Sequence, residues 1–543
     1  MPTLEFKGKQ IIYAHHLTVP VRALDAHPAK SFPPQKSPPE LDGNLIIHGD
    51  NLHALKALLP RYAGRVHCIY IDPPYNTGNE KWIYNDNVNS PQMRDWLKGK
   101  NPVDGEDLER HDKWLCMMWP RLHLLRELLA EDGVIFVSID DNELRRLHMV
   151  MDEVFEERNF IANLVWQNKE GGGKSDSKFF RIKHEYILCY AKNAPDAAIA
   201  SVGIKDADRY TRSDEYEKER GKHQLIKLDS ASIQYSKSLD YPIKSPDGTN
   251  IFPAKRKGKN ACWRWSRDKL QWGIRNGFVV IRKNKKGEWS VYTKQYLNCD
   301  SDGNLKPRRL QPLGVIDEFS TTQSSRAIEE LFGKAVFKYS KPSELVAYFL
   351  ERHPNKDAII LDSFAGSGTT AHAALALNKS DGGNRKFILV ECEDYADKVT
   401  AERVRLAIKT GLGGRFTYCT LGKEIDAEKM LTGENLPDYE TLARHLVWLN
   451  TGDSPKTITQ RKDGFFYETN SRLYHLIYEP NLEFLRSADS ALDGDRADRI
   501  AKKVAEKGKP AVVFAAAKYV GQKELTKMNI TFAALPFAVE GVV

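Results

Sequence analysis

Short apolar runs alternate with amphipathic runs in two stretches of the chain. In the first stretch, residues 45–193, strand-like runs lie near 45–48, 66–71, 133–139, 161–166 and 185–190, and helical patterns lie at 51–59, 112–130 and 141–156. In the second stretch, residues 331–412, strand-like runs at 358–362 and 385–391 flank a helical pattern from Thr369 to about Asn378. Strands that alternate with helices are typical of an α/β fold with a parallel sheet. We therefore predict that both stretches complete one sheet.

The rest of the chain lacks this rhythm. Residues 1–44 form an arm that we expect to contribute no core element, because it carries Pro28, Pro33, Pro34, Pro38 and Pro39. Residues 194–330 are more polar and rich in turn-forming residues, which predicts an inserted domain. Residues 413–543 contain a strand-like run at 511–515 and a helical pattern near 493–507, which predict a small C-terminal α/β domain.

The strand-like run at 66–71 ends at the tetrapeptide Asp72-Pro73-Pro74-Tyr75. Proline fixes φ and donates no hydrogen bond, so sheet pairing should stop here and leave Asp72 at the carboxyl end of a strand, where open α/β sheets bind ligands. The Asp72 carboxylate and the Pro73 carbonyl are two acceptors suited to the hydrogens of an exocyclic amino group. Pro74 stiffens the turn, and the Tyr75 ring could stack on an extruded base, a contact worth about 1–3 kcal/mol. We predict that this tetrapeptide is catalytic, with Asp72 orienting the amine rather than acting as a strong base.

A glycine turn, residues 364–370, follows the strand-like run at 358–362. Glycine between a strand and a helix lets the backbone approach a ligand closely. The next strand-like run ends in Glu391, at about the 20-residue spacing that lets a carboxylate reach ribose hydroxyls. No lysine follows the glycines as a Walker A loop requires, so we expect a nucleoside without a clamped phosphate chain. S-adenosylmethionine fits this description, and its candidate contacts here are Asp362, Phe364, Ala365, Gly366, Gly368, Thr369 and Glu391.

Positive charge is concentrated in one part of the chain. The net charge is +8, but residues 251–310 alone carry sixteen lysines and arginines against four acidic residues. Tryptophans, among them Trp263, Trp265 and Trp272, are interleaved with these charges. Phosphate neutralisation supplies much of non-specific DNA affinity, so we predict double-stranded DNA as the partner. The candidate DNA contacts are Lys255, Arg256, Lys257, Lys259, Arg264 and Arg267.

Composition narrows the cellular context. The 543 residues suggest three or four domains. Mean hydropathy is −0.52, and without an apolar run near 18 residues or a signal peptide we expect a cytoplasmic protein that does not enter a membrane. The seven cysteines form no CxxC pair, so we predict no metal site and no disulfide framework, but reduced and mostly buried thiols.

Together these motifs resemble the β-class adenine-N6 DNA methyltransferases, and most closely the modification (Mod) subunits of type III restriction systems. The similarity runs from about Leu45 to Gly422, and the extended sequence Asp72–Gly78 is its most specific part. It also includes the segments Ile47–Leu52, Gly133–Glu143, His184–Leu188, Tyr339–Pro342 and Gly411–Phe416.

The resemblance implies a Rossmann-like sheet that binds S-adenosylmethionine, with residues 194–330 as the target-recognition domain. It implies that Phe364, Gly366, Gly368 and Glu391 bind this cofactor, with Lys341 and Pro342 lining its methionine end. The residues Asp72 to Tyr75 would hold a flipped adenine. Asp50 either approaches the same pocket or is the N-cap of the helical pattern that follows it. Type III Mod subunits act as dimers and join a separate restriction (Res) subunit, so a homodimer and such a partner are expected.

Several other activities use related motifs. A cytosine-N4 methyltransferase is the closest alternative, because the same pocket chemistry serves either amino group, although such enzymes more often begin the tetrapeptide with Ser. An RNA or protein methyltransferase, or a stand-alone methylase of another defence system, could share the cofactor site. A non-catalytic DNA-specificity subunit would not need an intact tetrapeptide beside an intact glycine turn.

Overall fold

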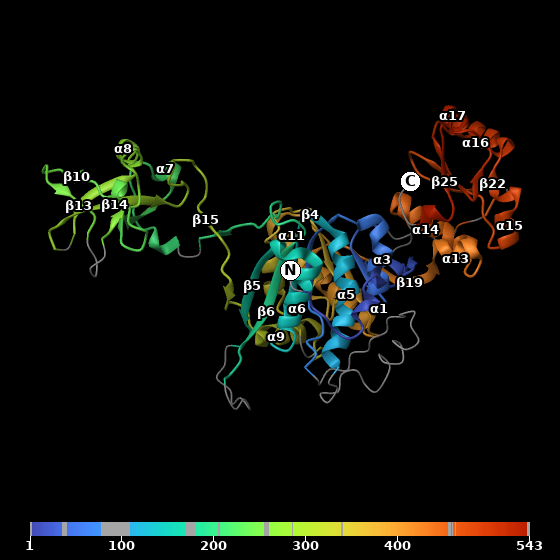
Figure 1. Cartoon of the computed structure of the whole chain (residues 1–543), viewed down its shortest axis with the longest axis horizontal. Coiled ribbons are helices and arrows are strands. Elements are labelled where there is room, and N and C mark those ends of the chain that lie inside the picture. Colours follow the sequence, from blue (N-terminus) through green and yellow to red (C-terminus); the bar gives the residue numbers. More distant parts are fainter. Residues whose placement is uncertain are drawn as a thin grey trace. The chain divides into compact units, whose positions relative to one another are not determined.

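A computed structural model gives the structure of the chain and divides it into two units (Figure 1). The structure describes residues 3–34, 41–77, 109–169, 180–204, 207–254, 260–284, 286–337, 340–453, 455, 458, 460–461 and 463–539. Unit 1 comprises residues 1–200 and 313–543, and unit 2 comprises residues 201–312. The boundaries of unit 2 differ from those of the inserted domain predicted at 194–330, because residues 313–330 contribute a strand and a helix to unit 1.

Unit 1 is built on a ten-stranded sheet, with the strand order β1-β19-β2-β18-β17-β3-β4-β6-β5-β16. In that order the strands are Val21–Ala26, Thr417–Ile425, Leu45–His48, Lys386–Glu391, Ile359–Asp362, Val66–Ile71, Leu129–Ile139, His184–Ala191, Phe160–Gln167 and Val315–Ile316. Strands β17 and β18 of the second stretch lie between β2 and β3 of the first. The prediction of one α/β sheet assembled from two separated segments is confirmed.

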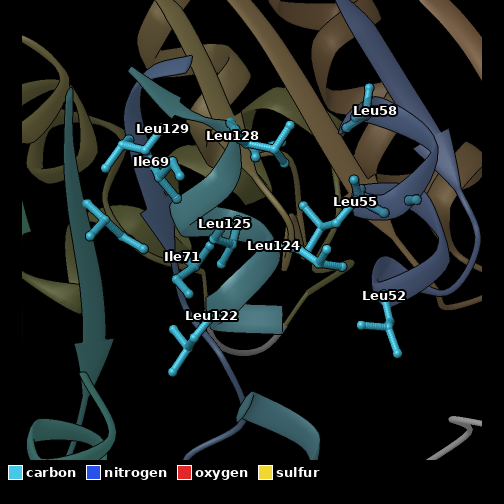
Figure 2. Packing of buried hydrophobic residues seen from close by; sticks show 14 of the residues in the cluster. Leu52, Leu55, Leu58, Ile69, Ile71, Leu122, Leu124, Leu125, Leu128 and Leu129 are labelled. Carbon is cyan, nitrogen blue, oxygen red and sulfur yellow. The ribbon is translucent and has the colours of Figure 1, made fainter. Parts of the chain in front are cut away.

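The two faces of the sheet have separate hydrophobic cores, because successive residues of a strand point to opposite faces. On one face, Ile69 and Ile71 of β3 pack with α3 (Asn51–Tyr62), α5 (Arg110–Leu128) and α6 (Leu144–Met151) (Figures 1 and 2). On the other face, Cys68 and Tyr70 pack with α10 (Ser343–Leu350), α11 (Thr369–Asp381) and α12 (Glu402–Ala407). Each fully buried leucine or isoleucine contributes about 1.5–3 kcal/mol, so both faces fix the strand ends firmly.

The sheet is mixed rather than wholly parallel. Strands β19, β2, β18, β17, β3 and β4 run parallel to one another. Strand β6, however, is antiparallel to both β4 and β5, and β1 is antiparallel to β19. The prediction of a parallel sheet was wrong for these strands, because an apolar run specifies a buried strand but not its direction.

The expectation that residues 1–44 contribute no core element was wrong. Strand β1 pairs with β19 at one edge of the sheet, and Ile12, Leu24 and Leu41 are buried in the core of unit 1. The five prolines lie outside β1, so they limit the length of the strand without preventing it. Strand β19 also extends the sheet beyond residue 412, where we expected the C-terminal domain to begin.

Unit 2 has its own small core. Its three-stranded antiparallel sheet has the order β13-β14-β8, comprising Val279–Lys283, Trp289–Tyr296 and His223–Lys227. The core includes Leu228, Trp263, Leu270 and Val291, with Leu270 supplied by α8 (Arg267–Arg275).

The C-terminal part of unit 1 contains a second sheet, with the order β20-β21-β23-β25. These strands are Phe465–Glu468, Leu473–Leu476, Ala511–Ala515 and Ile530–Ala534, and α16 spans Gly494–Lys507. The predicted strand at 511–515 and helix near 493–507 are confirmed. Six of the seven cysteines are buried, as expected. Within the described ranges, no helix combines the length and apolar character that a membrane span needs.

Candidate active site

The predicted catalytic tetrapeptide forms a braced turn at the carboxyl end of β3. Strand pairing ends at Ile71, as the two prolines predict. The indole nitrogen of Trp114 on α5 donates a hydrogen bond to the Pro74 carbonyl at 2.7 Å. Asn76 has a left-handed backbone with a φ of 57°, and its side-chain amide donates to the fully buried carboxylate of Glu143 at 2.5 Å. The turn is therefore held from two sides and presents Asp72 at a fixed position.

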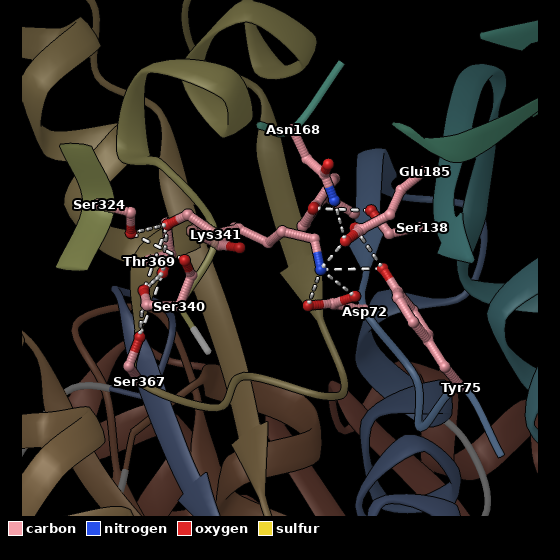
Figure 3. Close-up of polar contacts among 12 residues, drawn as sticks. Asp72, Tyr75, Ser138, Asn168, Glu185, Ser324, Ser340, Lys341, Ser367 and Thr369 are labelled. Atoms are coloured by element: carbon pink, nitrogen blue, oxygen red, sulfur yellow. Dashed lines mark hydrogen bonds and ion pairs between the residues drawn. The ribbon is translucent and has the colours of Figure 1, made fainter. Parts of the chain in front are cut away.

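The side chains of this turn meet the amine of Lys341 (Figure 3). Lys341 Nζ donates to both oxygens of Asp72, at 2.8 and 2.7 Å, and to the hydroxyl of Tyr75, at 2.8 Å. The Tyr75 hydroxyl in turn donates to Glu185 Oε2 at 3.0 Å. Glu185 Oε1 accepts a hydrogen bond from Asn168 Nδ2 at 2.7 Å. Residues from four distant parts of the chain thus form one polar network around Asp72.

Burial and charge set the protonation of this network. Burial raises the pKa of Tyr75 well above its usual range, and the carboxylates of Asp72 and Glu185 raise it further, so the phenol keeps its proton. Burial lowers the pKa of Lys341, but the same two carboxylates outweigh burial and leave this pKa raised. At neutral pH the network therefore contains a neutral phenol and a charged ammonium.

The glycine turn joins β17 to α11 next to this network. Gly366 and Gly368 have φ values of 51° and 82°, a region that favours glycine. A Cβ on Gly368 would lie 2.8 Å from the Thr400 carbonyl oxygen. The Thr400 hydroxyl also donates to the Gly366 carbonyl at 2.6 Å, and the Ala365 amide donates to the Val390 carbonyl at 3.0 Å. The turn is fixed in a shape that leaves no room for a side chain at Gly368.

Two buried carboxylates hold the amides of this turn. Asp362 Oδ1 accepts from the Phe364 amide at 3.0 Å, and its Oδ2 accepts from the Thr370 hydroxyl at 2.5 Å. Glu391 accepts from the Gly366 amide at 2.7 Å. Burial raises the pKa of Asp362 to about 7, and burial also raises the pKa of Glu391. The Glu391 carboxylate has further lone pairs, so it can accept from a ribose hydroxyl while it holds the turn.

A buried arginine connects the glycine turn to the segment that carries Lys341. Arg403 on α12, which is 2% exposed, donates from Nη1 to the hydroxyls of Ser340, Ser367 and Thr369 at 3.0, 2.7 and 2.7 Å. Burial lowers the pKa of Arg403 to about 10, so it stays protonated at neutral pH. The backbone before Lys341 is therefore fixed to the turn that the sequence predicts for the cofactor.

The residues present fit an S-adenosylmethionine site in this position. The glycines of the turn carry no side chains that would keep a ligand from the backbone, and Glu391 stands at the end of the neighbouring strand, where a ribose would lie. Pro342, predicted at the methionine end, is the N-cap residue of α10. Lys341 was expected at the same end, and its amine contacts both carboxylate oxygens of Asp72.

The predicted DNA contacts fall in a different part of the chain. Lys255, Arg256, Lys257 and Lys259 lie outside the described residues. Arg264 and Arg267 belong to unit 2, and both are exposed. The Arg267 guanidinium lies 5.1 Å from the ring centre of Tyr241. Trp263 is 1% exposed and packs in the core of unit 2, so its aromatic ring is structural.

Sequence reasoning assigned no role to Glu185, Asn168 or Arg403. Glu185 lies in the segment His184–Leu188, which carried part of the resemblance. Its position at the start of β6 was the signal that could have indicated a role at this site. Because β6 is antiparallel, its first residues reach the same edge of the sheet as the last residue of β4. Asp50 accepts from the Leu52 amide at 2.9 Å, so it is the N-cap of α3.

Comparison with known proteins identifies a family match. Residues 66–402 match the model of a family described as DNA methylase. The EcoPI Mod subunit of a type III restriction-modification enzyme from Escherichia phage P1 is 34% identical over 65% of this chain and 58% of its own length. The StyLTI Mod subunit from Salmonella typhimurium is 34% identical over 70% of this chain and 59% of its own length. The type II methyltransferase M.KpnI from Klebsiella pneumoniae is 32% identical over 74% of this chain and 91% of its own length. The chain thus spans somewhat over half the length of the two Mod subunits.

Proposed function

Because this chain belongs to the DNA methylase family, we propose that it transfers a methyl group from S-adenosylmethionine to the exocyclic amino group of a base in DNA. The bound cofactor supplies an electrophilic methyl group on a sulfonium. The chain's own residues orient the amine and hold the cofactor's nucleoside.

The observation that supports this proposal most strongly is the pairing of β3 with β17. The two strands run parallel, with Cys68 opposite Ile360 and Ile69 opposite Leu361. The residues that follow them, Asp72 and the glycine turn, therefore lie at the same edge of the sheet. A nucleophile held by Asp72 would then meet a methyl donor held by the glycine turn. Positioning of this kind can lower a reaction barrier by about 7–11 kcal/mol.

Asp72 acts by orientation and electrostatics. A base amine is a poor nucleophile because its lone pair is delocalised into the ring, and acceptors at its hydrogens favour the pyramidal, reactive form. The Asp72 carboxylate and the Pro73 carbonyl supply these acceptors. Once the nitrogen carries the new methyl group it loses a proton to water, so no strong base is required. Tyr75 offers its ring to the base, which must leave the duplex to be reached.

Adenine N6 is the proposed target, because the tetrapeptide begins with Asp72 as in the adenine-N6 enzymes that the chain resembles. Cytosine N4 is the second candidate, because the pocket holds an amino group and not a particular ring. Incubating the purified chain with DNA and labelled S-adenosylmethionine, then identifying the modified nucleoside by mass spectrometry, separates the two. We expect N6-methyladenine. Detection of N4-methylcytosine would make cytosine the target base instead. DNA without label would contradict the proposed activity.

We further propose that unit 2 selects the target sequence and that the chain works as the Mod subunit of a type III system. The names of the matched relatives and the basic, exposed residues of unit 2 support this assignment. The proposal includes a homodimer and a separate Res partner. Light scattering of the purified chain tests the dimer, with about twice the 61.8 kDa chain mass expected and the mass of one chain contradicting it.

A further inference from the structure

The amine of Lys341 occupies the acceptors that the proposed reaction needs. Both Asp72 oxygens accept from Lys341 Nζ, at 2.8 and 2.7 Å, and the Tyr75 hydroxyl accepts from it at 2.8 Å (Figure 3). The Lys341 side chain is 12% exposed, and Nζ also lies 4.9 Å from the centre of the Tyr75 ring. A nitrogen with several N–H donors thus stands against the carboxylate proposed to be catalytic and beside the Tyr75 hydroxyl.

A base amine and Lys341 Nζ cannot occupy the same position against Asp72. Nζ donates to both carboxylate oxygens, so it fills the position between them where an exocyclic amino group would donate. Entry of the target base therefore requires Lys341 Nζ to leave Asp72.

We propose that Lys341 is an internal stand-in for the target amine, which fills the amine position of the Asp72 pocket until a base displaces it, and that Glu185 then retains the displaced ammonium. This inference rests on the proposed function. The stand-in resembles the target amine in its donors but differs in reactivity. Because Asp72 and Glu185 together outweigh burial and keep the pKa of Lys341 raised, its nitrogen is protonated and has no lone pair to attack a methyl group.

The displacement involves the side chain and not the backbone. The Ser324 hydroxyl donates to the carbonyls of Ser340 and Lys341 at 2.8 and 3.0 Å. Arg403 binds the Ser340 hydroxyl at 3.0 Å. These contacts fix the backbone at Lys341, while its four-carbon stem can rotate about several bonds. The backbone anchor sets how far the amine can travel.

Glu185 is the carboxylate within reach of the displaced amine. Its Oε2 lies 3.4 Å from Lys341 Nζ, and it is held by Tyr75 at 3.0 Å and by Asn168 at 2.7 Å. Glu185 is therefore fixed before Lys341 moves. A buried ammonium that loses its partner is costly, so a second carboxylate lowers the cost of displacement. This makes Glu185 a positioning residue that acts through Lys341.

Steady-state kinetics with two variants and their combination test the proposal. The substrate is a duplex carrying the site that the wild-type chain methylates, and KM for DNA, kcat and the calorimetric affinity for S-adenosylmethionine are measured. Lys341→Met keeps most of the length of the side chain and removes the ammonium group. We expect KM for DNA to fall about 3–10-fold with cofactor affinity within two-fold, since the base no longer has to displace an ion pair. Glu185→Gln should raise KM for DNA about 3–10-fold, and the double variant should match Lys341→Met.

Other outcomes overturn the proposal. A loss of cofactor affinity of about tenfold or more in Lys341→Met, without a fall in KM for DNA, would make the lysine a cofactor ligand. A large fall in kcat at unchanged KM would make it a group that acts in the transition state. An additive double variant would mean that Glu185 does not act through Lys341. Circular dichroism shows whether each variant is folded, and Lys341→Gln is the replacement if Lys341→Met is not. If the wild-type chain methylates no DNA, the proposed function fails, whereas an active wild type with an unchanged Lys341→Met defeats the stand-in alone.

Discussion

The two turns at the carboxyl ends of β3 and β17 present different kinds of groups, one its side chains and the other its backbone. The Asp72 turn, closed by prolines, presents side chains, namely the carboxylate of Asp72 and the ring and hydroxyl of Tyr75. The glycine turn presents its backbone, and its neighbouring carboxylates, Asp362 and Glu391, point inward to its amides. Loss of a side chain should therefore impair the function of the first turn, whereas an added Cβ should impair that of the second.

The largest expected effect is at the first turn. Asp72→Ala removes the acceptors for the amine, and loss of one such preorganised group typically costs at least about 100-fold in rate. Methyl transfer should fall by this amount or more, while calorimetry should find cofactor affinity within a few-fold of the wild type. Equal losses of activity and cofactor affinity would place Asp72 in the cofactor site and erase the distinction between the turns.

The second turn should respond to a single methyl group. Gly368→Ala puts a Cβ 2.8 Å from the Thr400 carbonyl oxygen at a φ of 82°, so the turn must distort and cofactor affinity should fall about tenfold or more. The matched control is Gly382→Ala at the other end of α11, where φ is 68° and the added Cβ meets nothing within 4 Å. The control bears similar backbone strain but should keep cofactor affinity within about two-fold. Equal losses in both variants would show that strain alone, and not close approach, explains the glycine.

The inward carboxylate of the second turn should make stability depend on pH. Burial raises the pKa of Asp362 to about 7, against about 3.9 in an unfolded chain. The folded state therefore holds the proton more tightly, and this contribution to stability is complete below about pH 4 and is lost as pH rises towards about 7.

Thermal unfolding of wild type and Asp362→Asn across this pH range measures the effect. The asparagine keeps an oxygen for the Phe364 amide and does not ionise. The wild type should lose stability relative to Asp362→Asn by on the order of 1 kcal/mol per pH unit between pH 5 and pH 7, and then run parallel to it. If the stability of the two proteins changed with pH in parallel over the whole range, Asp362 would be charged in the folded chain.

The smallest expected effect lies away from both turns, in unit 2. If the exposed Arg264 and Arg267 each contact a phosphate, replacing one with glutamine should reduce the slope of log affinity against log salt by about 1. Arg158→Gln in unit 1 makes the same change in charge at a residue whose side chain is 78% exposed, and it should leave the slope unchanged. An unchanged slope in the unit 2 variants would mean that residues other than Arg264 and Arg267 contact the phosphates.

The sequence was most informative about elements whose pattern is local. The strands that precede the two turns, β3 and β17, and the turns themselves could be predicted, because apolar runs, prolines and glycines determine the structure of their own neighbourhood. The direction of β6 could not be predicted, since an apolar run reads the same in both directions. Strand β1 was missed because the prolines near it suggested an arm, although they lie beyond the residues that pair with β19.

The contacts of Lys341 illustrate what remained hidden. Its motif was recognised, and the resemblance placed it at the cofactor, but its contact with Asp72 depends on a backbone that Ser324 and Arg403 fix from other elements. Glu185 and Asn168 belong to this network through tertiary packing of β6 and β5. No spacing in the sequence reports a network that forms only when four separate segments meet.

We expect the two turns together to bring a methyl donor to an amine held at Asp72. The most direct measurement is a crystal structure of the chain with sinefungin, an unreactive analogue of S-adenosylmethionine that carries an amine-bearing carbon in place of the methylated sulfur. We predict its ribose at Glu391, its chain across Gly366 and Gly368, and its amine directed towards Asp72. An analogue bound away from the glycine turn, or one whose amine points away from Asp72, would contradict the account.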